Sequence, residues 1–160
     1  MKEQTRGIGK EGGGMTRHTF LLREGEWDAG GTYWTDQGAE FAVEGHTSIT
    51  HGRKHWVNDG VLRLLLNEPV EFQNRYEIQP FERGKDWTTW VARNPALGTL
   101  RGMFMVVGDC ILSSYTSEDG RHSGTESLVK VDDHMYRSWG CAFSDGSKLS
   151  SWSVELRRTG

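Results

Sequence analysis

The chain has 160 residues, enough for a single domain with a hydrophobic core. Its 19 Lys and Arg against 22 Asp and Glu leave a formal net charge of −3. That balance excludes a strongly basic nucleic-acid binder, because phosphate contacts need a clustered positive surface. No apolar run approaches the roughly 20 residues that span a bilayer, and the first residues lack the apolar stretch of a secretory signal. We therefore expect a cytoplasmic protein with no nucleic-acid and no membrane partner.

The glycine and aromatic contents point to strands and tight turns. There are 21 Gly, only 3 Pro and 11% aromatic residues, with seven Trp among them. This composition is typical of short strands joined by glycine turns. The two cysteines, Cys110 and Cys141, fit no zinc-binding spacing and cannot build a disulfide framework, so we expect reduced thiols.

The N-terminal part predicts a tail followed by one helical turn. Residues 1–14 are polar and end in three glycines, which indicates a disordered tail ahead of one domain over residues 15–160. Residues 16–23 fit a short helical turn, with Thr16 as the N-cap and Phe20, Leu21 and Leu22 covering an edge of the core. No later window repeats apolar residues at helical spacing over three turns, so we expect almost no helix elsewhere.

The rest of the chain predicts strands separated by turns. Asp-Gly pairs at 59–60, 119–120 and 145–146 are strong hairpin signals, because both residues tolerate the positive φ of the tight turns. The expected strands cover residues 24–35, 39–51, 55–58, 61–67, 71–81, 86–93, 99–107, 110–117, 123–131, 135–144 and 148–158.

Consecutive strands have no crossover long enough for a βαβ unit, so they are expected to pair antiparallel with their neighbours. An open sheet of this kind would leave two bare edges, and closing it removes them. We therefore predict an all-β fold, a single antiparallel up-and-down barrel of about eight to ten strands.

A short motif near the start of the first strand supports this fold. Gly25-Glu26-Trp27 resembles the Gly-x-Trp signature of the lipocalins and the wider calycin superfamily. In that family the Trp closes one end of the barrel, and an Arg near the last strand packs over its indole. Arg157 and Arg158 lie where that Arg belongs, and cation–π stacking is the physical reason for the pair. The resemblance implies structural roles for Gly25, Trp27 and Arg157, and a relationship with the intracellular bacterial lipocalin-like domains.

The inward face of such a barrel either fills a solid core or lines a cavity for one small ligand. An aromatic-lined cavity favours a flat, partly apolar metabolite. The candidate lining residues are Phe41, Val43, Trp56, Phe72, Asn74, Tyr76, Trp87, Phe104, Tyr115, Trp139 and Trp152.

Polar groups on this face are the candidates for chemistry. Tyr76, His51 and Tyr115 share the parity of apolar neighbours, and burial there tunes a phenol or imidazole for proton transfer. Asn74 is expected to orient a carbonyl of the bound molecule. The sequence thus favours binding of an aromatic or polycyclic metabolite and its conversion by isomerisation, cyclisation or elimination. A carrier without catalysis and an interaction module with a filled core stay open, as does a homodimer.

No cofactor or metal is expected. His46 and His51 fall on opposite strand faces, and no third ligand at zinc-like spacing accompanies His51 and His55. The chain has no Gly-x-Ser-x-Gly nucleophile motif. Its glycine-rich start follows no strand and opens no phosphate-binding helix, which excludes a nucleotide fingerprint.

Overall fold

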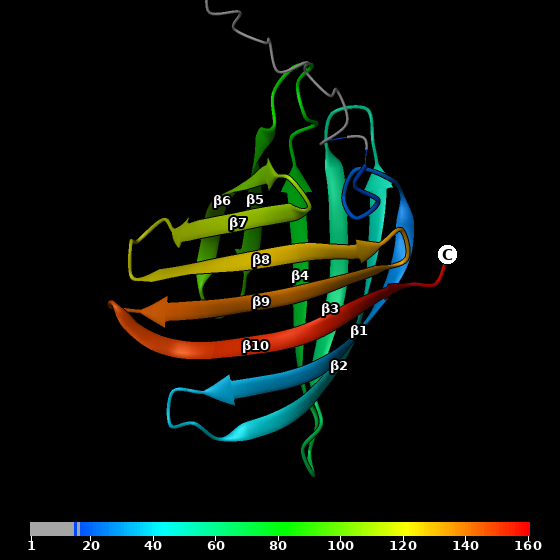
Figure 1. Ribbon diagram of the computed structural model, residues 1–160. Coiled ribbons are helices and arrows are strands. Elements are labelled where there is room, and N and C mark those ends of the chain that lie inside the picture. The colour runs from blue at the N-terminus through cyan, green and yellow to red at the C-terminus, as the bar shows by residue number, and fades with distance from the viewer. Residues whose placement is uncertain (1–14, 16) are drawn as a thin grey trace, which may run out of the picture.

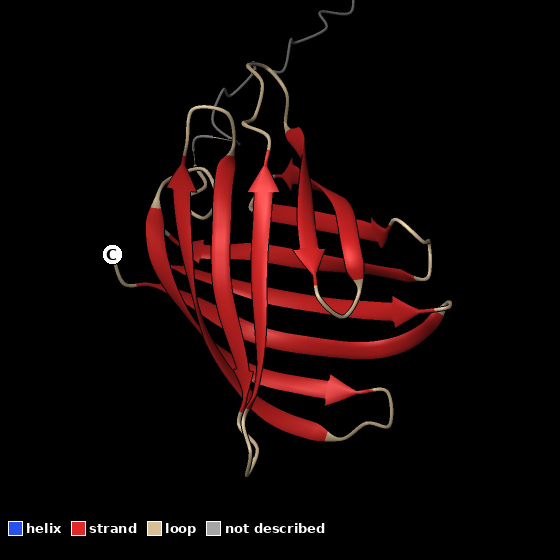
Figure 2. Ribbon diagram, turned by 180° about the vertical axis from the view of Figure 1, so that it is seen from behind, coloured by secondary structure: helices blue, strands red, loops and turns tan. Residues whose placement is uncertain are grey.

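The protein is a closed antiparallel barrel of ten strands (Figures 1 and 2). The computed structural model describes Met15 and residues 17–160. Each strand pairs with its sequence neighbours, and β1 closes the barrel against β10. The strands are β1 Gly25–Thr35, β2 Glu40–His51, β3 Trp56–Leu64, β4 Val70–Ile78, β5 Trp87–Asn94, β6 Gly98–Val107, β7 Cys110–Ser117, β8 His122–Asp132, β9 Met135–Ser144 and β10 Ser147–Arg158. The predicted all-β, single up-and-down barrel is confirmed.

The predicted helical turn near the N-terminus is wrong. Residues 17–22 form irregular turns, and Leu21 has a φ of 65°, which lies in the left-handed region that no right-handed helix contains. Thr16 and the predicted tail over residues 1–14 lie outside the described residues. Among the residues that are described, no helix is long and apolar enough to cross a membrane.

Two of the three Asp-Gly pairs form turns and the third does not. Gly120 has a φ of 73°, and Asp145 and Gly146 have φ values of 49° and 81°. Asp59 and Gly60, in contrast, lie inside the continuous strand β3 and pair with β2. A Cβ at Gly60 would lie 2.7 Å from Thr47 Oγ1, so this glycine serves close strand packing rather than a turn.

One end of the barrel is closed by the N-terminal segment of residues 17–22. The Tyr136 hydroxyl accepts hydrogen bonds from the backbone N–H groups of Thr19, at 3.0 Å, and Phe20, at 3.4 Å. It also lies 2.8 Å from His18 Nδ1. Phe20 and Tyr136 both pack edge-to-face against Trp27, which is fully buried. These contacts close this end of the barrel with aromatic side chains.

The arginine over this tryptophan is Arg158, which corrects the assignment to Arg157. The Arg158 Cζ lies 6.0 Å from the centre of the Trp27 ring, and its Nη2 donates to the Glu24 carbonyl. Arg157 is exposed on the outer face and pairs with Glu155 at 2.9 Å. Side chains alternate between the two faces of a strand, so only one residue of the Arg157-Arg158 pair points to the barrel axis.

The opposite part of the interior is less completely filled. A second, smaller apolar cluster lies there, built on Val43, Leu64 and Val154. Around it, Tyr33, Leu62 and Trp152 keep part of their surface accessible. The barrel therefore has one sealed end and one more open end.

Candidate functional site in the barrel interior

A group of aromatic side chains and one carboxyl meets inside the barrel. Tyr76 of β4, Trp90 of β5 and Tyr115 of β7 form a chain of rings with Trp90 in the middle. The Trp90 ring centre is 4.7 Å from that of Tyr76 and 5.9 Å from that of Tyr115. Across the interior, the Trp152 indole N–H of β10 donates a 3.0 Å hydrogen bond to the Glu126 carboxyl of β8. Strand alternation turns all five side chains inward.

Glycines on neighbouring strands make room for these rings. Trp90 pairs across the sheet with Gly102, Tyr115 with Gly124, and Trp152 with Gly140. A Cβ at any of the three glycines would overlap the paired aromatic ring. Each ring therefore lies flat against the wall over a glycine, instead of projecting across the lumen.

Glu126 is the ionisable group at the centre of this arrangement. Its side chain points into the barrel and is only partly exposed, and burial raises its pKa, while the hydrogen bond from Trp152 partly offsets the rise. The residue still keeps some accessible surface, as Tyr76 does. Because strand alternation turns both side chains inward, that surface faces the inside of the barrel.

The two tyrosines are electrostatically coupled to this carboxyl. Burial raises the pKa of Tyr76 and of Tyr115, and the negative charge of Glu126 raises the pKa of both phenols further. Neither hydroxyl makes a hydrogen bond within the described part of the chain. The buried Trp90 Nε1 also has no hydrogen-bond partner among the described residues. The site therefore offers one carboxyl and three unengaged donors.

Further residues of the inward face lie toward the open end. The rings of Tyr33 and Phe72 stack with their centres 6.4 Å apart and an interplanar angle of 27°. Phe72 is 40% exposed although it points inward, so this part of the interior is in contact with solvent. Phe41 pairs with Tyr33 across the β1–β2 ladder, and Asn74 lies on the same face of β4 as Tyr76.

His51 is separated from the other proposed proton-handling residues. Its Nε2 lies 2.8 Å from the Leu21 carbonyl, and its ring stacks on Trp56 at 3.9 Å. It therefore helps to hold the N-terminal segment against the sealed end. In the structure Tyr76 and Tyr115 both pack against Trp90, whereas His51 and Trp56 lie at the sealed end, next to the N-terminal segment.

Two of the predicted lining residues face outward. Trp87 is 40% exposed with Lys85 Nζ 5.4 Å from its ring centre, and Trp139 is 45% exposed. Strand parity decides both positions, since Trp90 and Gly140 are the inward residues of these strands. Phe104 and Val43 do point inward, but both are buried in apolar clusters.

The sequence reasoning missed Glu126 and Trp90. Both could have been found from alternation, because Glu126 lies two residues from the buried Leu128, and Trp90 two residues from the buried Thr88 and Ala92. A charged residue in register with buried neighbours is the signal of an ionisable group inside a barrel.

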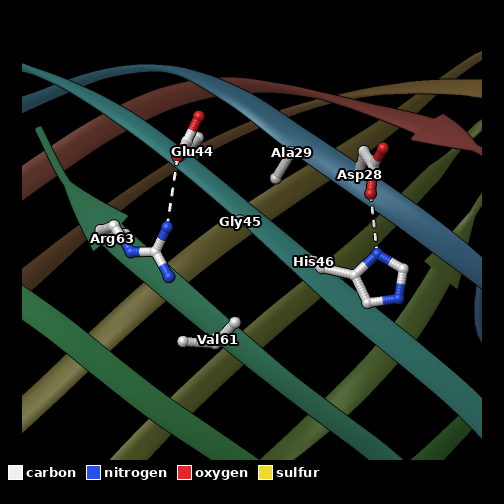
Figure 3. A pocket seen from close by; sticks show the side chains of 7 residues that line it. All are labelled: Asp28, Ala29, Glu44, Gly45, His46, Val61 and Arg63. Carbon is white, nitrogen blue, oxygen red and sulfur yellow. Dashed lines mark hydrogen bonds and ion pairs between the residues drawn. The ribbon is translucent and has the colours of Figure 1, made fainter.

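The outer wall carries a shallow groove of about 340 Å³ over β1, β2 and β3 (Figure 3). Its charges already satisfy one another. His46 bridges Asp28 at 2.7 Å and Glu26 at 2.5 Å, which raises the pKa of its imidazole. Arg63 pairs with Glu44 on the other side of the groove (Figure 3). In the described part of the chain, no group of three His, Cys, Asp or Glu side chains could hold a metal ion.

Comparisons with known proteins bear on the fold. No protein-family model and no curated protein matches the chain. Among solved structures it is similar to the S-type phycobiliprotein lyase CPES from Guillardia theta, with a TM-score of 0.62 and 8% identity, over 85% of this chain and 88% of that one. An N-terminal dehydratase from the difficidin assembly line aligns over 88% of this chain and 80% of that one at 9% identity, but its TM-score of 0.27 is too low to support a shared fold. The chain is thus a ten-stranded antiparallel barrel with a lipocalin-like fold similar to that of CPES.

Proposed function

We propose that the protein binds one small, flat and partly apolar molecule inside the barrel. The observation that carries this proposal is Glu126, an enclosed carboxyl that shares the interior with two phenols and an indole. Burying a carboxyl costs free energy unless partners compensate it, so a purely structural core gains nothing from this residue. A bound molecule with N–H or O–H donors supplies the missing partners.

The chemistry of the wall defines the class of ligand. The rings of Tyr76 and Tyr115, which keep part of their surface accessible, offer apolar surface to a flat, conjugated body. The unengaged phenol hydroxyls suit carbonyl groups, and Glu126 suits N–H groups. The similarity of fold to a phycobiliprotein lyase makes a linear tetrapyrrole one reasonable member of the class, since it is flat, conjugated and carries both kinds of group.

A titration with flat fluorescent or coloured probes tests the proposal. Tryptophan quenching is followed with anilinonaphthalene sulfonate and with the linear tetrapyrrole biliverdin, for the native chain and for Trp152→Phe and Trp139→Phe. Trp152 donates to Glu126 inside the barrel, whereas Trp139 lies on the outer wall. We expect a saturable site that Trp152→Phe weakens about tenfold, a loss of roughly 1.4 kcal/mol, and that Trp139→Phe leaves unchanged.

Two outcomes contradict binding inside the barrel. One is the absence of any saturable site up to millimolar probe. The other is equal weakening by the inner and the outer tryptophan variants. Mass spectrometry of the protein isolated from its own host, under native and then denaturing conditions, identifies the natural ligand directly.

A second candidate function is conversion of the bound molecule by acid–base chemistry without a cofactor. The observation that favours it is the raised pKa of Glu126 next to the raised pKa values of Tyr76 and Tyr115. A carboxyl with a raised pKa suits proton transfer near neutral pH. In this version Glu126 takes the role first given to His51, because His51 is engaged with the Leu21 carbonyl. Isomerisation, cyclisation and elimination are the reaction classes that need only such groups.

Once the ligand is known, single substitutions separate an enzyme from a carrier. An enzyme predicts that Glu126→Gln and Tyr76→Phe reduce kcat at least tenfold while the affinity changes less. A carrier predicts that the ligand is recovered unchanged after prolonged incubation with the native chain. Unaltered kcat in both variants rules out this assignment of proton-transfer residues.

A further inference from the structure

The strand β4 has a long unpaired edge. It pairs with β3 along its whole length, but with β5 only over residues 76–78. Within the described chain, residues 70–75 therefore have no strand partner on the β5 side. Figure 2 shows the β5–β6 hairpin ending partway along its long neighbour.

A single hydrogen bond shows which residues of this edge turn their N–H and C=O groups toward the β5 side. The Gln79 N–H donates to the Thr89 carbonyl of β5 at 2.9 Å, so odd-numbered residues of this stretch turn their backbone groups toward the β5 side. Further along the strand, Glu71, Gln73 and Arg75 then present unpaired N–H and C=O groups. Their side chains lie on the outer face and are exposed. Val70 and Phe72, which alternate with these residues along the strand, point to the inner face and are 42% and 40% exposed.

We propose that two copies of the chain associate through this edge, pairing β4 antiparallel with β4 of a second copy. The two-fold axis passes through Gln73, which faces Gln73 of the partner subunit. Glu71 then faces Arg75 of the partner subunit, and Arg75 faces Glu71 of the partner subunit. All of these are odd-numbered positions, so each opposed pair exchanges two backbone hydrogen bonds.

The charges on the outer face fit this register. Within one copy Glu44 pairs with Arg63 at 3.5 Å, Arg63 with Glu71 at 2.6 Å, and Arg75 with Asp59 at 3.2 Å. Across the two-fold axis the row continues as Glu71, Arg75 of the partner subunit and Asp59 of the partner subunit. The signs alternate without interruption, which stabilises cross-strand neighbours.

Neighbouring registers lack this match. An axis at Asn74 places Glu71 opposite Glu77 of the partner subunit, which is a repulsive pair. An axis at Phe72 places Arg75 opposite Pro69 of the partner subunit, which has no N–H to donate. Edges that resist association carry bulges, prolines or charged side chains, and charges resist pairing with a second copy when like charges come to face each other. The β4 edge carries an acid and a base placed symmetrically about Gln73 instead.

Charge reversal tests the proposal without removing the edge. Glu71→Arg gives a strand with two bases and Arg75→Glu gives one with two acids, so each repels its own copy. A mixture of the two restores an attractive pair at both ends. We expect sedimentation velocity at about 10–500 µM to show a micromolar native dimer, since the contact is smaller than a standard interface of about 1,600 Å². Each variant alone should be monomeric, and the equimolar mixture should dimerise.

The controls carry the same charge changes on strands that are paired on both sides. Glu155→Arg on β10 and Arg137→Glu on β9 also break outer-face ion pairs. Both should stay dimeric, with circular dichroism confirming the fold of all four variants. A native chain that is monomeric at 500 µM overturns the proposal. So does a native dimer that survives in either β4 variant.

A cross-link tests the register separately. In a background with Cys110→Ser and Cys141→Ser, Gln73→Cys places two thiols on the axis with Cα atoms about 5.5 Å apart, a distance that a disulfide spans. We expect an oxidised dimer from Gln73→Cys and none from Thr89→Cys, which is an exposed position on β5. Failure of Gln73→Cys to cross-link in a folded dimer contradicts this register. None of these measurements depends on a ligand in the barrel.

Discussion

A carboxyl among aromatic rings makes the stability of this barrel depend on pH. The pKa of Glu126 is raised above its ordinary value of 4.5 by burial, so the folded protein binds the proton more tightly than the unfolded chain does. Below that value both states are protonated and burial of the charge costs nothing. As the pH rises, the unfolded chain ionises first, and folding stability falls until the pH passes the folded-state pKa.

We therefore predict that Glu126→Gln raises the melting temperature by a few degrees at pH 8 and loses this advantage near pH 4. Thermal unfolding followed by circular dichroism across this pH range measures the effect. Glu77→Gln, which removes an exposed carboxyl from the outer face of β4, is the matched control and should stay close to the native profile. A pH-independent difference between Glu126→Gln and the native chain would mean that the carboxyl is not buried as a charge.

At the scale of the strand, paired glycines determine where the aromatic rings lie. Gly124→Ala would place a methyl group against the Tyr115 ring and push it away from the wall into the lumen. We expect a loss of about 1–3 kcal/mol in the free energy of unfolding, typical of overpacking, together with weaker probe binding. Gly30→Ala is the control, because a Cβ at Gly30 meets no atom within 4 Å. Urea unfolding compares the two, and equal stability would exclude a role for Gly124 in seating the ring.

The N-terminal segment depends on one hydroxyl group. Tyr136→Phe removes the acceptor for the N–H groups of Thr19 and Phe20 and the partner of His18 Nδ1. We predict a loss of about 1–3 kcal/mol, because buried donors are left unsatisfied. Tyr33→Phe serves as the control, since the Tyr33 ring lies toward the open end. Faster proteolysis around residues 17–22 in Tyr136→Phe alone would accompany the loss, whereas identical denaturation curves would contradict it.

For the whole molecule, the junction between β4 and β5 is the weakest part of the closed sheet. These strands are in register over three residue pairs, against nine between β1 and β10. Local opening follows the regions with fewest cooperative hydrogen bonds. We expect the amides of Glu77, Gln79 and Val91, which point across this junction, to exchange with deuterium about tenfold or more faster than those of the β1–β10 ladder. Uniform exchange around the barrel would mean that the short junction opens only with global unfolding.

Much of this architecture could be read from the chain, because strand periodicity and turn chemistry are local properties. Seven of the predicted strands differ from the observed ones by one to three residues at their ends, and β7 and β9 begin and end as predicted. The two strands predicted over residues 55–58 and 61–67 form the single strand β3. The turn predicted at Asp59-Gly60 is wrong because an Asp-Gly pair also fits within a strand, here where the adjacent strand needs room for Thr47. The predicted helical turn is wrong because Leu21 has a left-handed φ, and Phe20 packs edge-to-face against Trp27.

The candidate site was only partly visible. Tyr76, Tyr115 and Trp152 were predicted as lining residues because they are aromatic residues expected on the inward face of the barrel. Trp87 and Trp139 were placed inside because tryptophan content says nothing about parity in strands rich in aromatic residues on both faces. His51 was favoured for its chemistry, yet a backbone carbonyl from a distant segment engages it.

The sequence by itself determined the strands, most of their turns, and hence an antiparallel barrel, because alternation and glycine conformation depend on neighbours along the chain. Only the tertiary structure decided that Glu126 shares the interior with Tyr76, Tyr115 and Trp152, that Arg158 rather than Arg157 covers Trp27, and that β4 keeps a free edge. These features depend on the register and closure of the sheet. Register and closure bring together residues far apart in sequence, and no local pattern encodes those distances.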